Sequence, residues 1–111
     1  MADYFYSDGN GNLYRLIGNQ LSYEPVETIE SSSGVYSGGK SFEITLSDEQ
    51  IEELVTLFTA AFKNRTFRVD KRTLGSAEIR RIEEEDTFKV IVAMRSPDKA
   101  KIETFLSRLR P

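Results

Sequence analysis

Apolar and polar residues alternate through the first quarter of the chain, and a turn signal follows each short run. Asp8-Gly9, Asn10-Gly11 and Gly18-Asn19 separate runs that are rich in Tyr, Phe, Leu and Ile. Such dipeptides supply the positive φ angles that tight hairpin turns need. The pattern predicts a three-stranded meander over residues 3–26, in which Pro25 ends the last strand or marks an edge.

The hydrophobic period changes from two to 3.6 in the middle of the chain. Residues 42–46 alternate and predict a half-buried strand. Ser47 and Gln50 then match a capping box, which begins a helix that we expect to end near Lys63. One apolar stripe of this helix should face the sheet, formed by Ile51, Leu54, Val55, Phe58 and Phe62.

The last third of the chain predicts further strands and a second helix. Phe67 and Val69 indicate a short strand, and residues 73–76 indicate a turn. Residues 77–83 and 87–95 predict a hairpin closed by residues 84–86, and its second strand is apolar on both faces, which is typical of a central strand. Ser96-Pro97 predicts the start of a helix with an apolar stripe of Ile102, Phe105, Leu106 and Leu109.

These elements follow the order β-β-β-β-α-β-β-β-α, with no internal repeat and no linker long enough to separate two domains. Two amphipathic helices can cover one face of a sheet of about six or seven strands. We therefore expect residues 1–111 to form one α+β domain of two layers, with a mainly antiparallel sheet and both helices on one face. The other face is left to the aromatic meander or to solvent.

The chain of 111 residues contains no histidine and no cysteine. Their absence removes the commonest general base near neutral pH, the Ser-His and Cys-His nucleophiles and the most frequent zinc ligands. Asp8, Asn10 and Asn12 begin like a calcium loop, but Leu13 and Asn19 occupy the positions of the required Gly and Glu, so we interpret the segment as a turn. We expect a non-enzymatic protein with no cofactor and no metal site.

No charged and apolar leader opens the chain, and no apolar run approaches the roughly 20 residues of a membrane span. We expect a cytoplasmic protein without membrane contact, either a monomer or a homodimer formed through a free sheet edge. The net charge of -3 is uneven, because residues 1–62 carry two basic and ten acidic side chains whereas residues 63–111 carry 13 basic and eight acidic. The simplest interpretation is that the two halves neutralise each other.

Residues 31–41, SSSGVYSGGKS, depart most clearly from the composition of a folded core. Residues 34–41 match the phosphate-binding pattern G-x-x-x-x-G-K-S, but that motif needs a buried strand before it and a helix after it. Residues 27–31 do not have the pattern of a buried strand, and residues 42–46 predict a strand where a helix is required. We therefore interpret the match as accidental.

The same stretch has two other interpretations. Runs of Ser and Gly are typical of a flexible surface connection. An apolar and aromatic pair between glycines is also how a loop presents an anchor to a protein partner. Our leading hypothesis is a protein-binding domain, of the inhibitor or immunity type, that contacts its partner through residues 31–41 and in particular through Ser33, Val35, Tyr36 and Lys40. Residues 33–36, Ser-Gly-Val-Tyr, resemble the short Ser-Gly-x-Tyr loop of some periplasmic lysozyme inhibitors, which illustrates this mode of contact.

The alternative hypothesis is a small-anion or nucleic-acid binder that uses the basic segment 63–81. Seven basic side chains lie in this segment against only Asp70 and Glu78, and Phe67 is available to stack on a base. A compact anion site would join Lys40, Arg68, Arg72 and Ser76. The pI of 5.0 and the acidic helix face of Glu49, Glu52 and Glu53 argue against nucleic acid as the partner.

Overall fold

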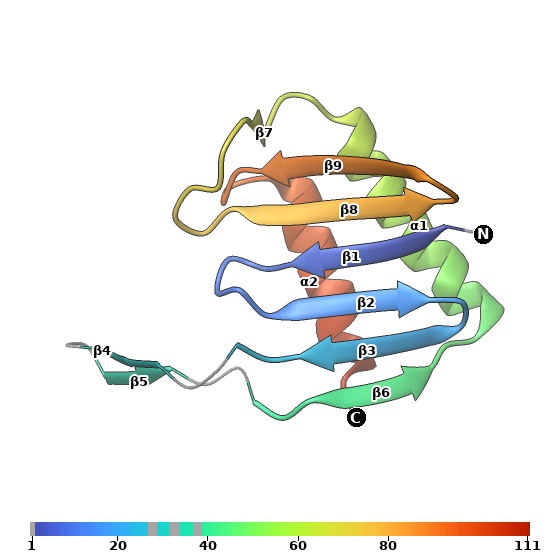
Figure 1. Ribbon diagram of the computed structural model, residues 1–111, viewed down its shortest axis with the longest axis horizontal. Helices are drawn as coiled ribbons and strands as arrows, with labels where there is room; N and C mark the ends of the chain where they lie inside the picture. The colour runs from blue at the N-terminus through green and yellow to red at the C-terminus, as the bar shows by residue number, and fades with distance from the viewer. Residues whose placement is uncertain (1, 27–28, 32–33, 37–38) are drawn as a thin grey trace.

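The computed structural model describes residues 2–26, 29–31, 34–36 and 39–111, and for residues 29–31 and 34–36 it describes the backbone alone (Figure 1). The strands are β1 (Asp3–Ser7), β2 (Leu13–Ile17), β3 (Gln20–Glu24), β4 (Ile29–Ser31), β5 (Gly34–Tyr36), β6 (Phe42–Thr45), β7 (Arg68–Val69), β8 (Ala77–Glu83) and β9 (Asp86–Val92). The helices are α1 (Asp48–Lys63) and α2 (Pro97–Leu109).

Seven strands form one open antiparallel sheet in the order β6-β3-β2-β1-β8-β9-β7. β1 lies at the centre and pairs with β8, so the N-terminal meander and the C-terminal hairpin belong to the same sheet. Both helices lie on one face of this sheet, and no helix or strand among the described residues covers its other face, which we call the open face (Figure 1). The predicted α+β fold of two layers is confirmed, with the short pair β4 and β5 added before β6.

Alternation along the strands decides which side chains face the helices. On β1, Tyr4 and Tyr6 are buried in the core, whereas Phe5 between them points to the open face and is only partly buried. Leu54 and Phe58 of α1 pack against these rings, with Tyr4 and Phe58 stacked at a ring distance of 5.2 Å. The larger members of the shared core also include Tyr14, Leu16, Leu21, Tyr23, Leu46, Ile79, Val90, Val92, Ile102 and Leu106.

Both helices begin where their caps predict. The Ser47 hydroxyl accepts a hydrogen bond from the Gln50 N–H at 3.2 Å, and the Gln50 side chain accepts one from the Ser47 N–H at 2.9 Å. Ser96 caps α2 by accepting from the Lys99 N–H at 3.2 Å. These contacts satisfy backbone donors that a helix leaves unpaired, so the local sequence alone positions both helix starts.

The interpretation of the last strand as central is wrong. β9 lies next to the outermost strand, β7, and ends at Val92 instead of continuing to residue 95. Ile91 is apolar and buried on the open side because Val69 of β7 is paired with it. A two-residue edge strand therefore gives β9 the second apolar face that the sequence attributed to a central position.

The interpretation of the Ser/Gly stretch as only a flexible connection is also corrected for part of its length. β4 and β5 pair in antiparallel fashion, with Ile29 opposite Tyr36 and Ser31 opposite Gly34. They form a separate two-stranded sheet that projects from the ends of β3 and β6 (Figure 1). No alternating pattern marks so short a pair in the sequence.

Candidate binding surfaces

The connection between β3 and β6 is far longer than its geometry requires. β3 ends at Glu24 and β6 begins at Phe42, so the connection spans 17 residues, 25–41, which we call the insertion. Tyr23 is paired directly with Phe42, so the two strand ends are neighbours. Antiparallel neighbours are commonly joined by about two to five residues, so most of the insertion is not needed to connect the strands.

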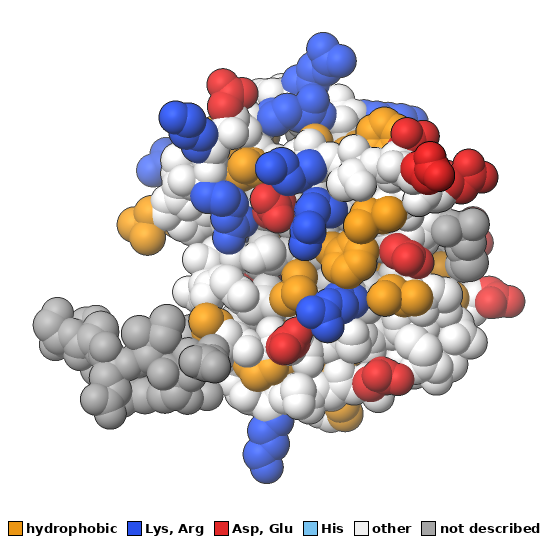
Figure 2. Space-filling view, viewed as in Figure 1, with side chains coloured by type: hydrophobic (Ala, Val, Ile, Leu, Met, Phe, Trp, Pro, Cys, Tyr) orange, Lys and Arg blue, Asp and Glu red, His pale blue; other side chains and the backbone are white. Residues whose placement is uncertain are grey.

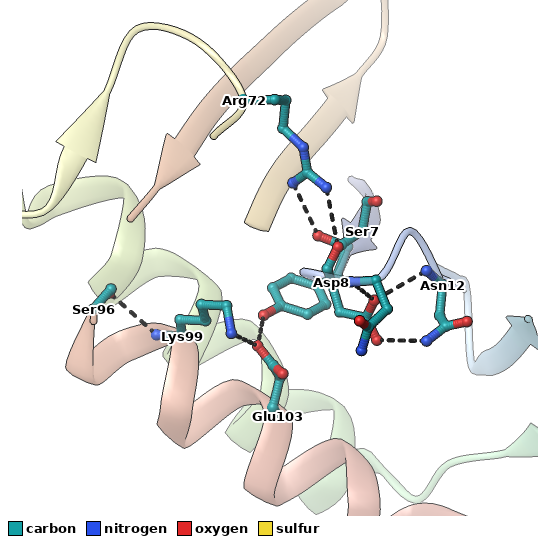
Figure 3. A network of polar contacts seen from close by, with 9 residues as sticks. Ser7, Asp8, Asn12, Arg72, Ser96, Lys99 and Glu103 are labelled. Carbon is teal, nitrogen blue, oxygen red and sulfur yellow. Dashed lines mark hydrogen bonds and ion pairs between the residues drawn. The ribbon is translucent and has the colours of Figure 1, made fainter. Parts of the chain in front are cut away.

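The insertion is attached to the body at its second residue. The Val26 N–H donates to Asn12 Oδ1 at 2.9 Å. The Asn12 side-chain amide donates to Asp8 Oδ2 at 3.0 Å (Figure 3). Asp8 Oδ1 also accepts from the backbone N–H groups of Asn10 and Asn12. The buried Asp8 carboxylate thus holds the turn that the sequence predicts, and Asn12 links that turn to the insertion.

The residues predicted to contact a partner fall on and around the hairpin. Val35 and Tyr36 belong to β5, whose backbone is described but whose side chains are not. Ser33 lies outside the described residues. Lys40 is exposed just before β6 and lines a hollow of about 390 Å³ together with Ser41, Phe42, Arg110 and Pro111.

Arg110 at this hollow is held by two buried tyrosines. Its guanidinium lies over the Tyr23 ring at 4.6 Å and donates a hydrogen bond to the Tyr14 hydroxyl at 2.7 Å. This hydrogen bond raises the pKa of Arg110, while burial raises the pKa values of Tyr14 and Tyr23. The sequence predicted Lys40 as a site residue but gave no sign that Arg110 would lie beside it, because no local pattern joins residues so distant in the chain.

The strands around the phosphate-loop pattern have the wrong arrangement for that motif. Its first residues, Gly34–Tyr36, form β5, and the residues after it, Phe42–Thr45, form β6. Phosphate binding by this motif requires the N-terminus of a helix directly after the loop. The segment that follows residues 34–41 is a strand, as the sequence predicts.

Arg72, a predicted anion-binding residue, joins two turns of the fold. Its guanidinium donates to the backbone carbonyl of Asp8 at 3.0 Å and to that of Ser7 at 3.4 Å (Figure 3). The two turns approach closely, because a Cβ atom added to Gly9 would lie 2.9 Å from the Gly75 carbonyl oxygen. At least two of the N–H donors of Arg72 are therefore used to hold the end of β1.

Two of the other predicted anion-binding residues, Ser76 and Arg68, likewise hydrogen-bond within the fold. The Ser76 hydroxyl is buried, donates to the Thr73 carbonyl at 2.8 Å and accepts from the Thr73 N–H at 2.9 Å. Arg68 donates to the Phe62 carbonyl at the end of α1. Lys40 precedes the edge strand β6, three strands or about 14 Å from the β1 end that Arg72 contacts, so the structure does not bring these four residues together.

A partly buried polar network joins the centre of the sheet to α2. The Tyr6 hydroxyl donates to Glu103 Oε2 at 2.6 Å, and Lys99 Nζ lies 2.7 Å from the same oxygen (Figure 3). Burial, and then the negative charge of Glu103, raise the pKa of Tyr6 above its ordinary value. Every member has a partner, so the network fixes α2 against β1.

The open face of the sheet carries a row of cations around one aromatic ring. Arg80 is paired with Lys89 on one side and with Phe5 on the other, and Phe5 is paired with Arg15. We call Lys89, Arg80, Phe5 and Arg15 the cationic row. Paired residues on neighbouring strands project to the same face, so the four side chains are neighbours.

Apolar side chains surround Phe5 on this face. Leu13, Ile17 and Ile82 each lie two residues along a strand from Arg15 or Arg80 and so project to the same face, and Ile17 is 49% exposed. Figure 2 shows the same face, with hydrophobic side chains gathered at its centre and basic side chains among and above them. Alternation could have assigned Phe5 and Arg15 to this face from the sequence, but only the pairing of β1 with β8 brings Arg80 and Lys89 beside them.

Among the described residues, no three acidic, histidine or cysteine side chains are grouped so that they could hold a metal ion. The described helices also lack a stretch that is both long and apolar enough to cross a membrane. Comparison of the chain with family models, curated proteins and solved structures finds no match.

Proposed function

We propose that this chain is a non-enzymatic protein-binding domain that contacts its partner through the insertion. The observation that carries the proposal is the length of the insertion relative to its span. Connections longer than about 12–15 residues in compact domains are usually functional or disordered. This one includes a paired hairpin, which favours a binding role.

The hairpin is also a poor candidate for independent stability. A two-stranded hairpin alone is marginally stable in water, whereas three strands or packing on another element stabilise it. Among the described residues, β4 and β5 pair only with each other. An extended segment of a partner protein that adds to either free edge would satisfy its backbone groups and stabilise the pair.

The contact would then combine backbone pairing with side-chain anchoring. β5 carries Val35 and Tyr36, the apolar and aromatic pair expected to anchor the partner, and Lys40 follows at the base of the hairpin. Aromatic anchors commonly supply most of the affinity of a protein interface. The cytoplasmic location and the choice between monomer and homodimer stay predictions from the sequence.

A shortened chain that lacks residues 28–39 tests the proposal. It keeps Val26 and its hydrogen bond to Asn12, and leaves a connection of five residues between β3 and β6. Wild type, the shortened chain and Tyr36→Ala would each be used to capture cross-linked proteins from the source lysate. The control is Leu74→Ala, because Leu74 is an apolar side chain 94% exposed on a different loop.

We expect wild type and Leu74→Ala to recover the same partner, the shortened chain to lose it and Tyr36→Ala to recover much less. Circular dichroism and thermal unfolding would establish that all four proteins are folded. Recovery of the same proteins by the shortened chain and by Tyr36→Ala would overturn the proposal.

A further inference from the structure

The cationic row places an aromatic ring between positive charges on an uncovered sheet. The Arg80 guanidinium lies 5.4 Å from the centre of the Phe5 ring. Arg15 is paired with Phe5 from the opposite side, on β2. The backbones of Arg15 and Arg80 are therefore two strand spacings, or about 10 Å, apart. Lys89 extends the row on the next strand and is exposed.

We propose that the cationic row binds single-stranded nucleic acid, with an unpaired base stacked at Phe5 and phosphates at the flanking cations. Unpaired bases stack on aromatic rings and on guanidinium planes, and sheets that present such groups are common single-strand platforms. The apolar side chains of Leu13, Ile17 and Ile82 offer the rest of a base a dry surface. None of these residues belongs to the insertion, so the two proposals are tested by different variants.

The acidic pI alone does not oppose this assignment, because part of the acidic charge lies on the helix layer. Glu49, Glu52 and Glu53 are exposed on α1, which covers the opposite face of the sheet (Figure 1). A net charge of -3 averaged over the molecule therefore understates the positive charge along the row. Electrostatic attraction of a strand depends on the local field near the contact, since exposed charges are screened over about 10 Å at 0.1 M salt.

Four acids, Asp3, Glu24, Glu43 and Glu78, share the open face with the row by the strand register, and they limit the strength expected. Glu24 is 2.9 Å from Arg15 and Glu78 is 3.6 Å from Arg80. Exposed ion pairs of this kind are weak, and each guanidinium has five N–H donors, so both arginines keep donors for phosphate. We expect a dissociation constant on the order of 10–100 μM at low salt, in the range of non-specific binding.

A second copy of the chain fits this face less well than a nucleic acid does. Arginines flank Phe5 on both sides. In a symmetric dimer formed by two such faces, with the two-fold axis passing between the two Phe5 rings, the arginines of one copy would face the arginines of the other. Like charges that face each other in an interface are unfavourable. A strand with phosphates on either side of a base has the complementary order of charges.

Fluorescence anisotropy with a fluorescein-labelled single-stranded oligothymidylate of 12 nucleotides tests the proposal on the full chain. A duplex of equal length and a polyglutamate peptide would serve as competing probes. The variants are Phe5→Leu and Lys89→Ala. The matched control is Phe88→Leu, because Arg81 lies 4.8 Å from the Phe88 ring in a similar pair on the helix side of the sheet.

We expect binding of the single strand with a slope of about -2 in a plot of log K against log salt, from three phosphate contacts. Phe5→Leu should weaken binding about tenfold by removing the stacked ring. Lys89→Ala should reduce the slope to about -1.4. Phe88→Leu should change neither quantity.

Three results would overturn the proposal. The first is no binding of the single strand at low salt. The second is binding that Phe5→Leu leaves unchanged, which would remove the stacked base. The third is equal or tighter binding of polyglutamate, which would assign the row to an acidic protein partner.

Discussion

Two strand pairs of the same sheet are joined in very different ways. β8 and β9 turn through Glu84 and Glu85 alone, whereas β3 and β6 are joined by the 17 residues of the insertion. Both pairs are antiparallel neighbours, and their paired ends are adjacent in each case. The first connection is as short as the fold allows, and the second carries chain that the fold does not require.

The difference in length between the two connections separates the chain that folding needs from the chain that is available for binding a partner. Closing a long loop costs little, because each doubling of its length adds only about 0.6 kcal/mol. A long insertion is therefore tolerated in this position, and among the described residues the hydrogen bond from Val26 to Asn12 attaches it to the body. Function, and not folding, is the simplest reason for its length.

The largest effect should come from the turn that holds the root of the insertion. Asp8→Ala removes a buried carboxylate that accepts from Asn10 and Asn12, so it should lower the free energy of unfolding by about 3 kcal/mol. Urea denaturation of the variant and of wild type measures this difference. Asp70→Ala, at an exposed acid, should cost under about 0.5 kcal/mol. Equal losses in the two variants would show that the Asp8 turn does not anchor the fold.

The effect of connection length on stability can be tested by giving β8 and β9 a long connection. Twelve Gly and Ser residues placed between Glu84 and Glu85 should destabilise the protein by about 2 kcal/mol, because the closed loop becomes about seven times longer. The same denaturation measurement applies. A variant as stable as wild type would mean that loop length is not a folding cost in this sheet.

Sequence reasoning found the elements and missed the contacts between distant ones. Local signals such as the Ser47 and Ser96 caps, the Asp8-Gly9 turn and the alternation over residues 42–46 each gave an element at its observed place. They could not give the pairing of β1 with β8, on which the cationic row depends, because pairing joins residues more than 70 positions apart. Val69 covering Ile91 was missed for the same reason.

A smaller effect should come from the backbone of the tight turn. Glu84 has a φ of 54°, a conformation that costs a residue with a Cβ atom about 1 kcal/mol. Glu84→Gly should therefore raise the free energy of unfolding by about 1 kcal/mol or slightly less, since glycine also gains entropy when unfolded. Its neighbour is the control, because no positive φ is recorded there, and Glu85→Gly should give a small loss. A gain from both changes would point to removal of negative charge as the cause.

The central claim is that the insertion serves recognition and is surplus to folding. Its most direct test is the free energy of unfolding of the shortened chain without residues 28–39, measured by urea denaturation beside wild type. Reducing the connection from 17 residues to five should stabilise the protein by about 1 kcal/mol. A loss of about 2 kcal/mol or more would contradict the claim, because it would show that the fold itself depends on the insertion.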